Sequence, residues 1–175
     1  MQVEDLTIRR AEPDDSSALY EMFKSPTLYA NTLQLPYPSR EMWRQRLAEP
    51  GDGRHNLVAL AEGRVVGMFS LHAFTRPRRQ HAGAIGMSVH DGWHGKGVGS
   101  ALMRAGLDLA DNWLNLTRLE LEVYTDNEPA VRLYERFGFE REGLLRRHAY
   151  RDGRFVDSYV MARLRDVNSG PDSRS

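Results

Sequence analysis

The chain contains no cysteine. This absence excludes disulfides, a thiolate nucleophile, and zinc or iron–sulfur sites held by cysteine. Long apolar runs are also missing: no segment approaches the roughly 18 residues of a membrane-spanning helix, and the first residues, MQVEDLTIRRAEPDD, lack the apolar stretch of a signal peptide. These absences predict a cytoplasmic protein without a membrane partner.

An excess of charge of either sign is lacking too, because 24 basic residues balance 24 acidic ones. Nothing global therefore favours nucleic acid as a partner. The six histidines show no metal-ligand spacing, so no metal site is expected. A length of 175 residues with 41% hydrophobic residues suits one domain, expected over residues 1–167. Residues 168–175, NSGPDSRS, are small, polar and turn-forming, which predicts a disordered tail.

Hydrophobic periodicity and turn residues give the order strand, two helices, three strands, helix, strand, helix, two strands. Strands are expected at about residues 6–11, at 56–74 as a hairpin around Glu62-Gly63, and at 81–90, 118–124, 139–149 and 155–164. Helices are expected at about residues 14–24, after Ser39, at 97–113 and after Asn127, with an irregular segment at 25–39. This order predicts an α/β fold: a mixed sheet with helices on both faces.

A glycine-rich turn, GMSVHDGWHGKGVGSALM (residues 86–103), joins an apolar strand to a helix. Backbone N–H groups at a helix start bind phosphate, and Lys96 could add charge at the rim. A P-loop is excluded because Gly97, not Ser or Thr, follows Lys96. The dinucleotide fingerprint fits Gly95 and Gly97 but fails at Ser100, and some 80 residues precede the turn.

A third pattern is the pyrophosphate loop of acetyl-CoA-dependent N-acetyltransferases, Gln/Arg-x-x-Gly-x-Gly/Ala. In this chain it reads His94-x-x-Gly97-x-Gly99, with His94 in place of Gln or Arg. A glycine turn that binds nothing is the remaining alternative for this motif alone.

A second motif, EVYTDNEPAVRLYERFGFEREG (residues 122–143), decides between these alternatives. It resembles the second signature of the GCN5-related N-acetyltransferase (GNAT) family, Asn-x-x-Ala-x-x-x-Tyr-x-x-x-Gly-Phe. Asn127, Ala130, Tyr134, Gly138 and Phe139 match it. Both signatures occur in the right order, so the chain resembles this family over about residues 5–165.

The resemblance implies the GNAT fold, a mixed and mostly antiparallel sheet of about seven strands. Its central parallel strands, ending near Val89 and Tyr124, would splay apart to admit acetyl-CoA as cosubstrate. Carried over residue by residue, the resemblance assigns the acyl and pantetheine portion to Met87, Ser88 and Val89, the diphosphate to Gly95, Lys96, Gly97, Val98, Gly99 and Ser100, and the cofactor arm to Asn127.

Within the matched motif, Tyr134 is the expected donor to the leaving thiolate, because a phenol (pKa about 10) stays protonated where a thiol (about 8.5) ionises. Burial for packing alone is the alternative. Glu122 shares a strand face with Glu120 and Tyr124, and resembles in position the catalytic Glu of ribosomal-protein N-terminal acetylases. It is the candidate base, acting through a water; a solvated or paired carboxylate is the alternative.

A backbone N–H within residues 87–89 is the expected oxyanion donor, which a bulge at Gly86 could expose. Because the chain has no cysteine, direct attack in a ternary complex is expected rather than an acyl-enzyme.

Residues 31–49, 76–81, 111–114 and 153–163 resemble the bacterial L-amino-acid N-acetyltransferases, which act on free phenylalanine and methionine. This resemblance implies a small-molecule amine substrate, the α-amino group of a free amino acid. Leu33 and Tyr37 could form an apolar pocket, and Arg78 or Arg79 could bind the carboxylate. The alternatives are an acetylase of protein N-termini or of another small amine such as an antibiotic, and a non-catalytic acyl-CoA sensor. A homodimer is expected, as is common for such folds.

Overall fold

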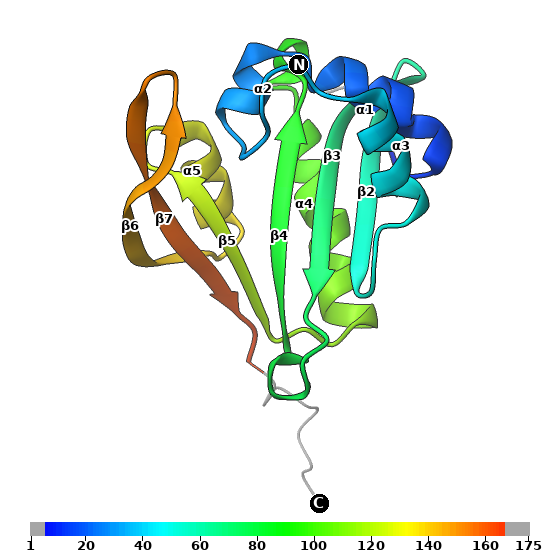
Figure 1. Ribbon diagram of the computed structural model, residues 1–175. Helices are drawn as coiled ribbons and strands as arrows, with labels where there is room; N and C mark the ends of the chain where they lie inside the picture. Colours follow the sequence, from blue (N-terminus) through cyan, green and yellow to red (C-terminus); the bar gives the residue numbers. More distant parts are fainter. Residues whose placement is uncertain (1–5, 167–175) are drawn as a thin grey trace, which may run out of the picture.

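The computed structural model describes residues 6–166, in which seven strands form one sheet (Figure 1). The strands are β1 (Thr7–Arg10), β2 (Arg54–Ala61), β3 (Arg64–Ala73), β4 (Ala82–Val89), β5 (Arg118–Tyr124), β6 (Glu140–Arg151) and β7 (Arg154–Leu164). The helices are α1 (Ser16–Met22), α2 (Pro26–Ala30), α3 (Arg40–Ala48), α4 (Val98–Asp108) and α5 (Glu128–Arg136). Single turns of other helix types are η1 (Pro13–Asp15), η2 (Pro77–Arg79), η3 (Asp91–Trp93) and η4 (Leu109–Trp113). The expected tail at 168–175 lies outside the described residues.

Local signals set most of these boundaries. Ser39 caps α3 by accepting a hydrogen bond from the Met42 amide (3.3 Å), and Asn127 caps α5 by accepting one from the Ala130 amide (3.4 Å). The β2–β3 hairpin turns at Glu62-Gly63, where both residues have positive φ (51° and 70°). Such a two-residue turn matches the twist of the flanking strands. The predicted hairpin and both predicted helix starts are confirmed.

The strand order is β1-β2-β3-β4-β5-β7-β6, and only β4 and β5 run parallel. Their pairing is short: it joins Ala82–Ala84 to Arg118–Glu120 and then stops. Beyond that point the two strands diverge (Figure 1). The predicted mixed sheet with a splayed parallel pair is confirmed.

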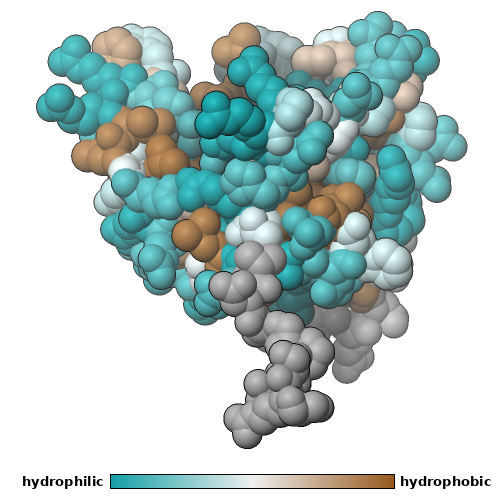
Figure 2. Space-filling model, turned by 90° about the horizontal axis from the view of Figure 1, so that it is seen from below, coloured by the Kyte–Doolittle hydropathy of each residue, from teal (hydrophilic) through white to brown (hydrophobic). Residues whose placement is uncertain are grey.

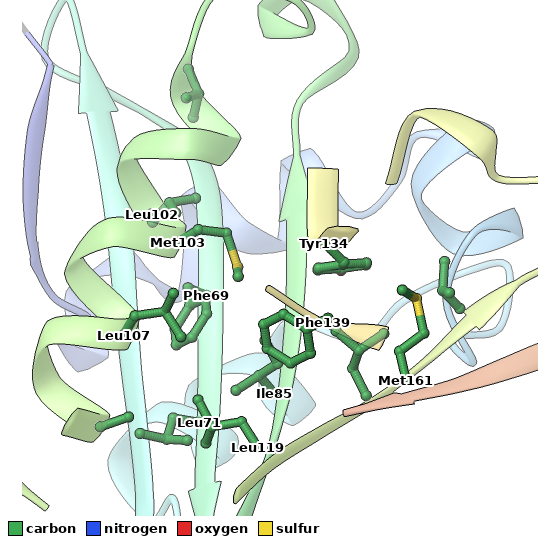
Figure 3. Close-up of a cluster of buried hydrophobic side chains, with 14 of the residues drawn as sticks. Phe69, Leu71, Ile85, Leu102, Met103, Leu107, Leu119, Tyr134, Phe139 and Met161 are labelled. Atoms are coloured by element: carbon green, nitrogen blue, oxygen red, sulfur yellow. The ribbon is translucent and has the colours of Figure 1, made fainter. Parts of the chain in front are cut away.

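Helices cover both faces of the sheet. Phe69 and Leu71 of β3 belong to one buried cluster with Leu102 and Leu107 of α4, and this cluster also includes Tyr134 and Phe139 (Figure 3). On the opposite face, α1, α2 and α3 pack around Trp43 in a second cluster. Gly106 allows the close approach of α4, since a Cβ there would lie 2.2 Å from the Phe69 ring. The first cluster spans the point where β4 and β5 part, so it holds the two halves of the sheet together.

One local prediction was wrong, and one was right in extent but not in helix type. Residues 25–39 were expected to be irregular, but Pro26 begins the five-residue helix α2. Pro fits the first position of a helix, where its missing N–H is not needed. The helix expected to reach residue 113 ends as an α-helix at Asp108, because η4 is π-helical, with the Leu114 amide bonded to the Leu109 carbonyl (3.1 Å). The wider turn accompanies a bidentate pair between Asp111 and Arg163 of β7 (2.9 and 2.8 Å).

Candidate active site

A cleft of about 1580 Å³ opens where β4 and β5 part. It reaches from α2, α3 and Phe23, the residue after α1, across the end of β4, to the glycine turn and α5. The structure brings together in it most residues that the two sequence motifs single out: Met87, Ser88, Val89, Gly95, Gly97, Val98, Gly99, Ser100, Glu122, Asn127 and Tyr134. Lys96 stands apart from this set; its ammonium lies 4.7 Å from the centre of the Trp93 ring.

The glycine turn presents unpaired amides to the cleft. The first amide that bonds within α4 is that of Ala101, to the Gly97 carbonyl (3.0 Å), so the amides of Val98, Gly99 and Ser100 have no partner in the helix. Gly97 has φ +86°, and a Cβ there would meet no atom within 4 Å. Free amides at the positive end of a helix dipole, next to open space, are suited to bind a diphosphate.

His94 fixes the turn to the strand before it. Its Nε2 lies 2.8 Å from the carbonyl oxygen of Val89, and the Gly92 amide donates to Nδ1 of His90 (3.1 Å). The side chain that replaces Gln or Arg in the first motif therefore anchors the turn through a backbone carbonyl. Ser25 ties the α1–α2 connection to the same turn, donating to Asp91 (2.6 Å).

The backbone of β4 divides its hydrogen bonds between its two sides. The backbone amide of His90 donates to the Val66 carbonyl (2.8 Å), and the Ala82 carbonyl accepts from the Phe74 amide (3.0 Å). Because antiparallel pairing alternates along a strand, the even-numbered residues of β4 bond to β3, and Met87 and Val89 direct their amides toward β5. Pairing with β5 has ended by then, so these amides face the cleft. The β3–β4 register shows no shift; the divergence of the strands, and not a bulge at Gly86, exposes the amides.

Tyr134 lies between the hydrophobic cluster and the cleft. Its side chain is 6% exposed, and its ring packs edge-to-face on Phe139 (5.9 Å between centroids; Figure 3). Burial raises the pKa of Tyr134 to about 12. Within residues 6–166 its hydroxyl makes no hydrogen bond, although the residue lines the cleft. The phenol is therefore protonated at neutral pH and available as a donor to a group bound in the cleft.

A turn with free amides suited to a diphosphate, two strand amides that face the cleft and a buried phenol fit transfer of an acyl group from a nucleotide-linked donor. A family model, Acetyltransferase (GNAT) family, matches residues 17–139. The chain belongs to the GNAT acetyltransferase family. It is an N-acetyltransferase that uses acetyl-CoA, and the glycine turn with Met87 and Val89 provides amides suited to that cosubstrate.

Known proteins resemble this acetyltransferase over nearly its full length. L-amino acid N-acetyltransferase AaaT of Escherichia coli (strain K12) is 44% identical over 161 residues, which are 92% of this chain and 99% of that protein. The crystal structure of an acetyltransferase of the GNAT family from Streptococcus pneumoniae has a TM-score of 0.80 and 30% identity, covering 91% of this chain and 99% of the other. The structure of yncA from Salmonella typhimurium with its cofactor acetyl-CoA also has a TM-score of 0.80, covering 97% and 99%; at 22% identity it shows the fold alone.

A smaller cavity of about 380 Å³ adjoins the acetyltransferase's cleft, and both are lined by Asn31, Thr32 and Glu122. Leu33, Ile85, Leu121 and Val160 supply its apolar wall. The Tyr124 hydroxyl donates to the Thr32 carbonyl (2.9 Å) and so ties the segment after α2 to β5. Glu122 is half exposed, and its Oε2 lies 3.2 Å from Nε2 of His148.

Glu120, the other carboxylate on this strand face, is held by arginines. Burial raises its pKa, but hydrogen bonds from Arg118 (2.8 Å) and Arg79 (2.7 Å) outweigh burial, so its pKa lies below the usual value. A carboxylate so stabilised in its charged form is a weak base. Glu122 is therefore the better placed of the two to meet an amine.

The residues expected to bind the acceptor are not brought together. Leu33 lines the small cavity, whereas Tyr37 is 98% exposed and lines neither cavity. Arg78 and Arg79 lie in η2, in the turn before β4 begins, which is the end of the strand opposite to the cleft (Figure 1). The surface at that end is largely hydrophilic (Figure 2). Arg79 is occupied by Glu120 and lies over the Phe74 ring (4.9 Å).

Two other arginines, which sequence reasoning did not single out, line the cleft. Arg46 of α3 lies over the Trp43 ring (4.8 Å), and Arg54 begins β2. Burial, and then the charge of Arg54, lower the pKa of Arg46. Neither arginine forms an ion pair within residues 6–166. Two neighbouring cations without a carboxylate partner make this part of the cleft attractive to an anion.

Within residues 6–166, no group of three or more side chains of the metal-binding types lies close enough together to hold an ion, and no helix there has the length and hydropathy to cross a membrane.

Proposed function

We propose that this acetyltransferase moves the acetyl group of acetyl-CoA onto the α-amino group of a free L-amino acid. The observation that carries the proposal is that two cavities meet at Glu122 where β4 and β5 part. The glycine turn and Tyr134 line the large cleft, and apolar residues with the carboxylates of Glu120 and Glu122 line the small cavity. The acetyl donor and the amine can therefore approach one point from two sides. The 44% identity to L-amino acid N-acetyltransferase AaaT supports the choice of an amino acid.

The residues of the cleft supply what the transfer needs. Amides of residues 98–100 hold the diphosphate, with Lys96 adding charge at the rim, and Asn127, whose Nδ2 is not used in capping α5, bonds the pantetheine arm. The amides of Met87 and Val89 polarise the thioester carbonyl as its oxygen becomes negative. Tyr134 then gives its proton to the departing sulfur, since its pKa of about 12 keeps it protonated.

Direct attack by the amine on the thioester is the simplest route through this site. The chain has no cysteine that could carry the acetyl group. The new N–C bond forms as the C–S bond breaks, so both substrates must be bound together. Initial-rate kinetics should show intersecting lines in double-reciprocal plots; a ping-pong pattern would exclude direct attack.

For the acceptor, Glu122 attracts the ammonium group and Leu33 contacts an apolar side chain. We assign the carboxylate to Arg46 and Arg54, the pair of cations in the same cleft, in place of Arg78 and Arg79. A cytoplasmic homodimer stays a prediction, and light scattering on the purified protein checks its oligomeric part.

The test is release of free thiol from acetyl-CoA over a panel of amines: the free amino acids, phenethylamine, a peptide with a free N-terminus, spermidine and an aminoglycoside. We expect turnover of phenylalanine or methionine. Phenethylamine, which lacks the carboxylate, should have a higher KM than phenylalanine.

Arg54→Gln should raise KM for phenylalanine about tenfold, as expected for one charged hydrogen bond. The same variant should leave KM for phenethylamine unchanged. Arg78→Gln, which tests the assignment made from sequence, should change neither. Acetylation of the peptide alone would select an N-terminal acetylase, and silence across the panel would contradict the proposal.

A further inference from the structure

Three polar side chains from neighbouring strands form a chain of contacts at the small cavity. Nδ1 of His148, on β6, lies 2.9 Å from the Ser158 hydroxyl on β7. Its Nε2 lies 3.2 Å from Oε2 of Glu122 on β5. All three residues line the small cavity, but their exposure differs: Ser158 is 1% exposed, whereas the side chains of His148 and Glu122 are 23% and 50% exposed. The contacts thus run from the half-exposed Glu122, through His148, to Ser158, which is buried in the sheet.

A break in the β6–β7 ladder brings His148 to this position. Leu145 pairs with Ser158 and Ala149 with Val156, so β6 advances four residues while β7 advances two. Arg147 adopts φ +50° within this bulge, and its amide donates to the Asp157 carboxylate (2.7 Å). Bulges next to active sites commonly re-aim a side chain. Here the bulge turns the imidazole toward the point where the two cavities meet.

We propose that His148 is the general base that removes the proton from the acceptor's ammonium group, and that Glu122 holds the ammonium and then stabilises the imidazolium. The proposal rests on the proposed function, because it needs an amine in the small cavity. It moves the base from Glu122, the residue that the sequence pattern favours, to a residue that no motif contains.

The chemistry requires Nε2 to accept a proton. A serine hydroxyl can either donate to Nδ1 or accept from Nδ1–H, so Ser158 satisfies both tautomers of the ring. An ammonium bound at Glu122 favours the tautomer with Nδ1–H on Ser158, which leaves the Nε2 lone pair free. The first proton passes from nitrogen to Nε2, and the neutral amine attacks the thioester carbon. The C–S bonding pair leaves with sulfur, which takes the Tyr134 proton. The second proton, which nitrogen loses as the amide forms, returns the Tyr134 phenolate to a phenol, and Nε2 releases the first proton to water.

An imidazole suits this task better than a carboxylate, because its ordinary pKa of about 6.5 lies nearer to neutral pH than that of a glutamate, about 4.3. Among the described residues, Glu122 is the charged group in contact with the ring, and the Arg147 guanidinium beside it in the bulge lies over the Phe155 ring (5.5 Å). Glu120 is paired with Arg118 and Arg79, Arg151 with Asp126, and Asp157 with the Arg147 amide; Asn31 and Thr32 are uncharged, and the Tyr124 hydroxyl is bonded to Thr32.

The experiment compares the pH profile of kcat, at saturating acetyl-CoA and acceptor, for the wild-type enzyme, His148→Gln, Glu122→Gln and His81→Gln. His81, before β4, lines neither cavity and serves as the matched control. Wild-type kcat should rise with pH along a limb that reports loss of a proton from the general base. His148→Gln should lose this limb and about 10²-fold in kcat, while the Kd for acetyl-CoA stays the same. Glu122→Gln should move the limb to lower pH, because the charge that favours the imidazolium is gone.

A second variant guards against misfolding at the bulge. His148→Ala leaves a space for free imidazole, and added imidazole should restore kcat in proportion to its neutral form; a merely structural defect would not respond. If the wild type turns over its acceptor and His148→Gln keeps the same kcat and the same pH dependence of kcat, the role of His148 is overturned and the proposed function still holds. Absence of turnover by the wild type on every amine overturns the proposed function, and this inference with it.

Discussion

Tyr134 shows at the residue scale how packing and chemistry are combined. The same burial that seats its ring on Phe139 raises its pKa to about 12, so the phenol keeps its proton at neutral pH. We expect Tyr134→Phe to lower kcat by about 100-fold, the usual contribution of a general acid. The ring still packs in the cluster, so the Kd for acetyl-CoA, measured by calorimetry, should change by less than about threefold.

The sign of this pKa shift also predicts a pH profile. A phenol whose pKa is raised stays protonated at every pH at which the enzyme is assayed. Deprotonation of Tyr134 should therefore cause no fall in kcat below about pH 10. Tyr20→Phe is the matched control, because Tyr20 packs beside Arg40 away from the cleft. Full activity in Tyr134→Phe would remove the general-acid role.

Single residues also show where a sequence is informative about a site. Asn127 and Gly97 were predictable because a cap and a positive-φ turn depend on neighbours in the chain. Arg79 was not, because its partner, Glu120, lies 41 residues away. The choice between Arg79 and Arg54 as a carboxylate ligand depends on which end of a strand each occupies. The identity of the residue does not predict that position.

At the element scale, the turn before α4 should owe its function to backbone conformation and open space. Gly97→Ala places a Cβ at φ +86°, in the region where the diphosphate would lie. We expect the Kd for acetyl-CoA to rise by at least about tenfold, or about 1.4 kcal/mol. Titration calorimetry measures it.

Gly153→Ala separates strain from lost binding. Gly153, in the β6–β7 turn, also has positive φ (+76°) and no atom within 4 Å of a Cβ, but it does not line the cleft. Both variants should lose about 1 kcal/mol of stability from the strained backbone. Only Gly97→Ala should lose affinity; equal affinities in the two variants would show that the turn does not bind the cosubstrate.

Elements with a strong local pattern were predictable, and irregular ones were not. The strict alternation of RLELEVY gave β5 its observed bounds, Arg118–Tyr124. Helix α2 is too short for a periodicity to show, and the π-helical turn η4 continues the apolar pattern of α4. The bulge in β6 has no sequence mark either, since it arises from pairing with β7. The candidate base therefore escaped prediction because its position depends on that bulge.

At the scale of the whole molecule, the sheet consists of two wings, β1–β4 and β5–β7, joined by the short β4–β5 pairing and by the hydrophobic cluster behind it (Figures 1 and 3). The place of β7 between β5 and β6 is a long-range choice that no local pattern reveals. The resemblance to a family supplied the splayed parallel pair but not this strand order. This arrangement keeps one edge of β4 unpaired, which is costly unless water or a ligand bonds its amides.

The unpaired edge predicts an alternating response to acetyl-CoA. Amides of Gly86 and Ser88 bond to β3 and should exchange slowly with or without ligand, whereas those of Met87 and Val89 face the cleft and should exchange fast in the free enzyme. At ten times Kd, Met87 and Val89 should slow by about tenfold relative to their neighbours. Amide exchange followed by NMR resolves single residues, and Gly97→Ala at the same ligand concentration should show less slowing. A uniform change over all four amides would mean that the ligand stabilises the fold without bonding to this edge of β4.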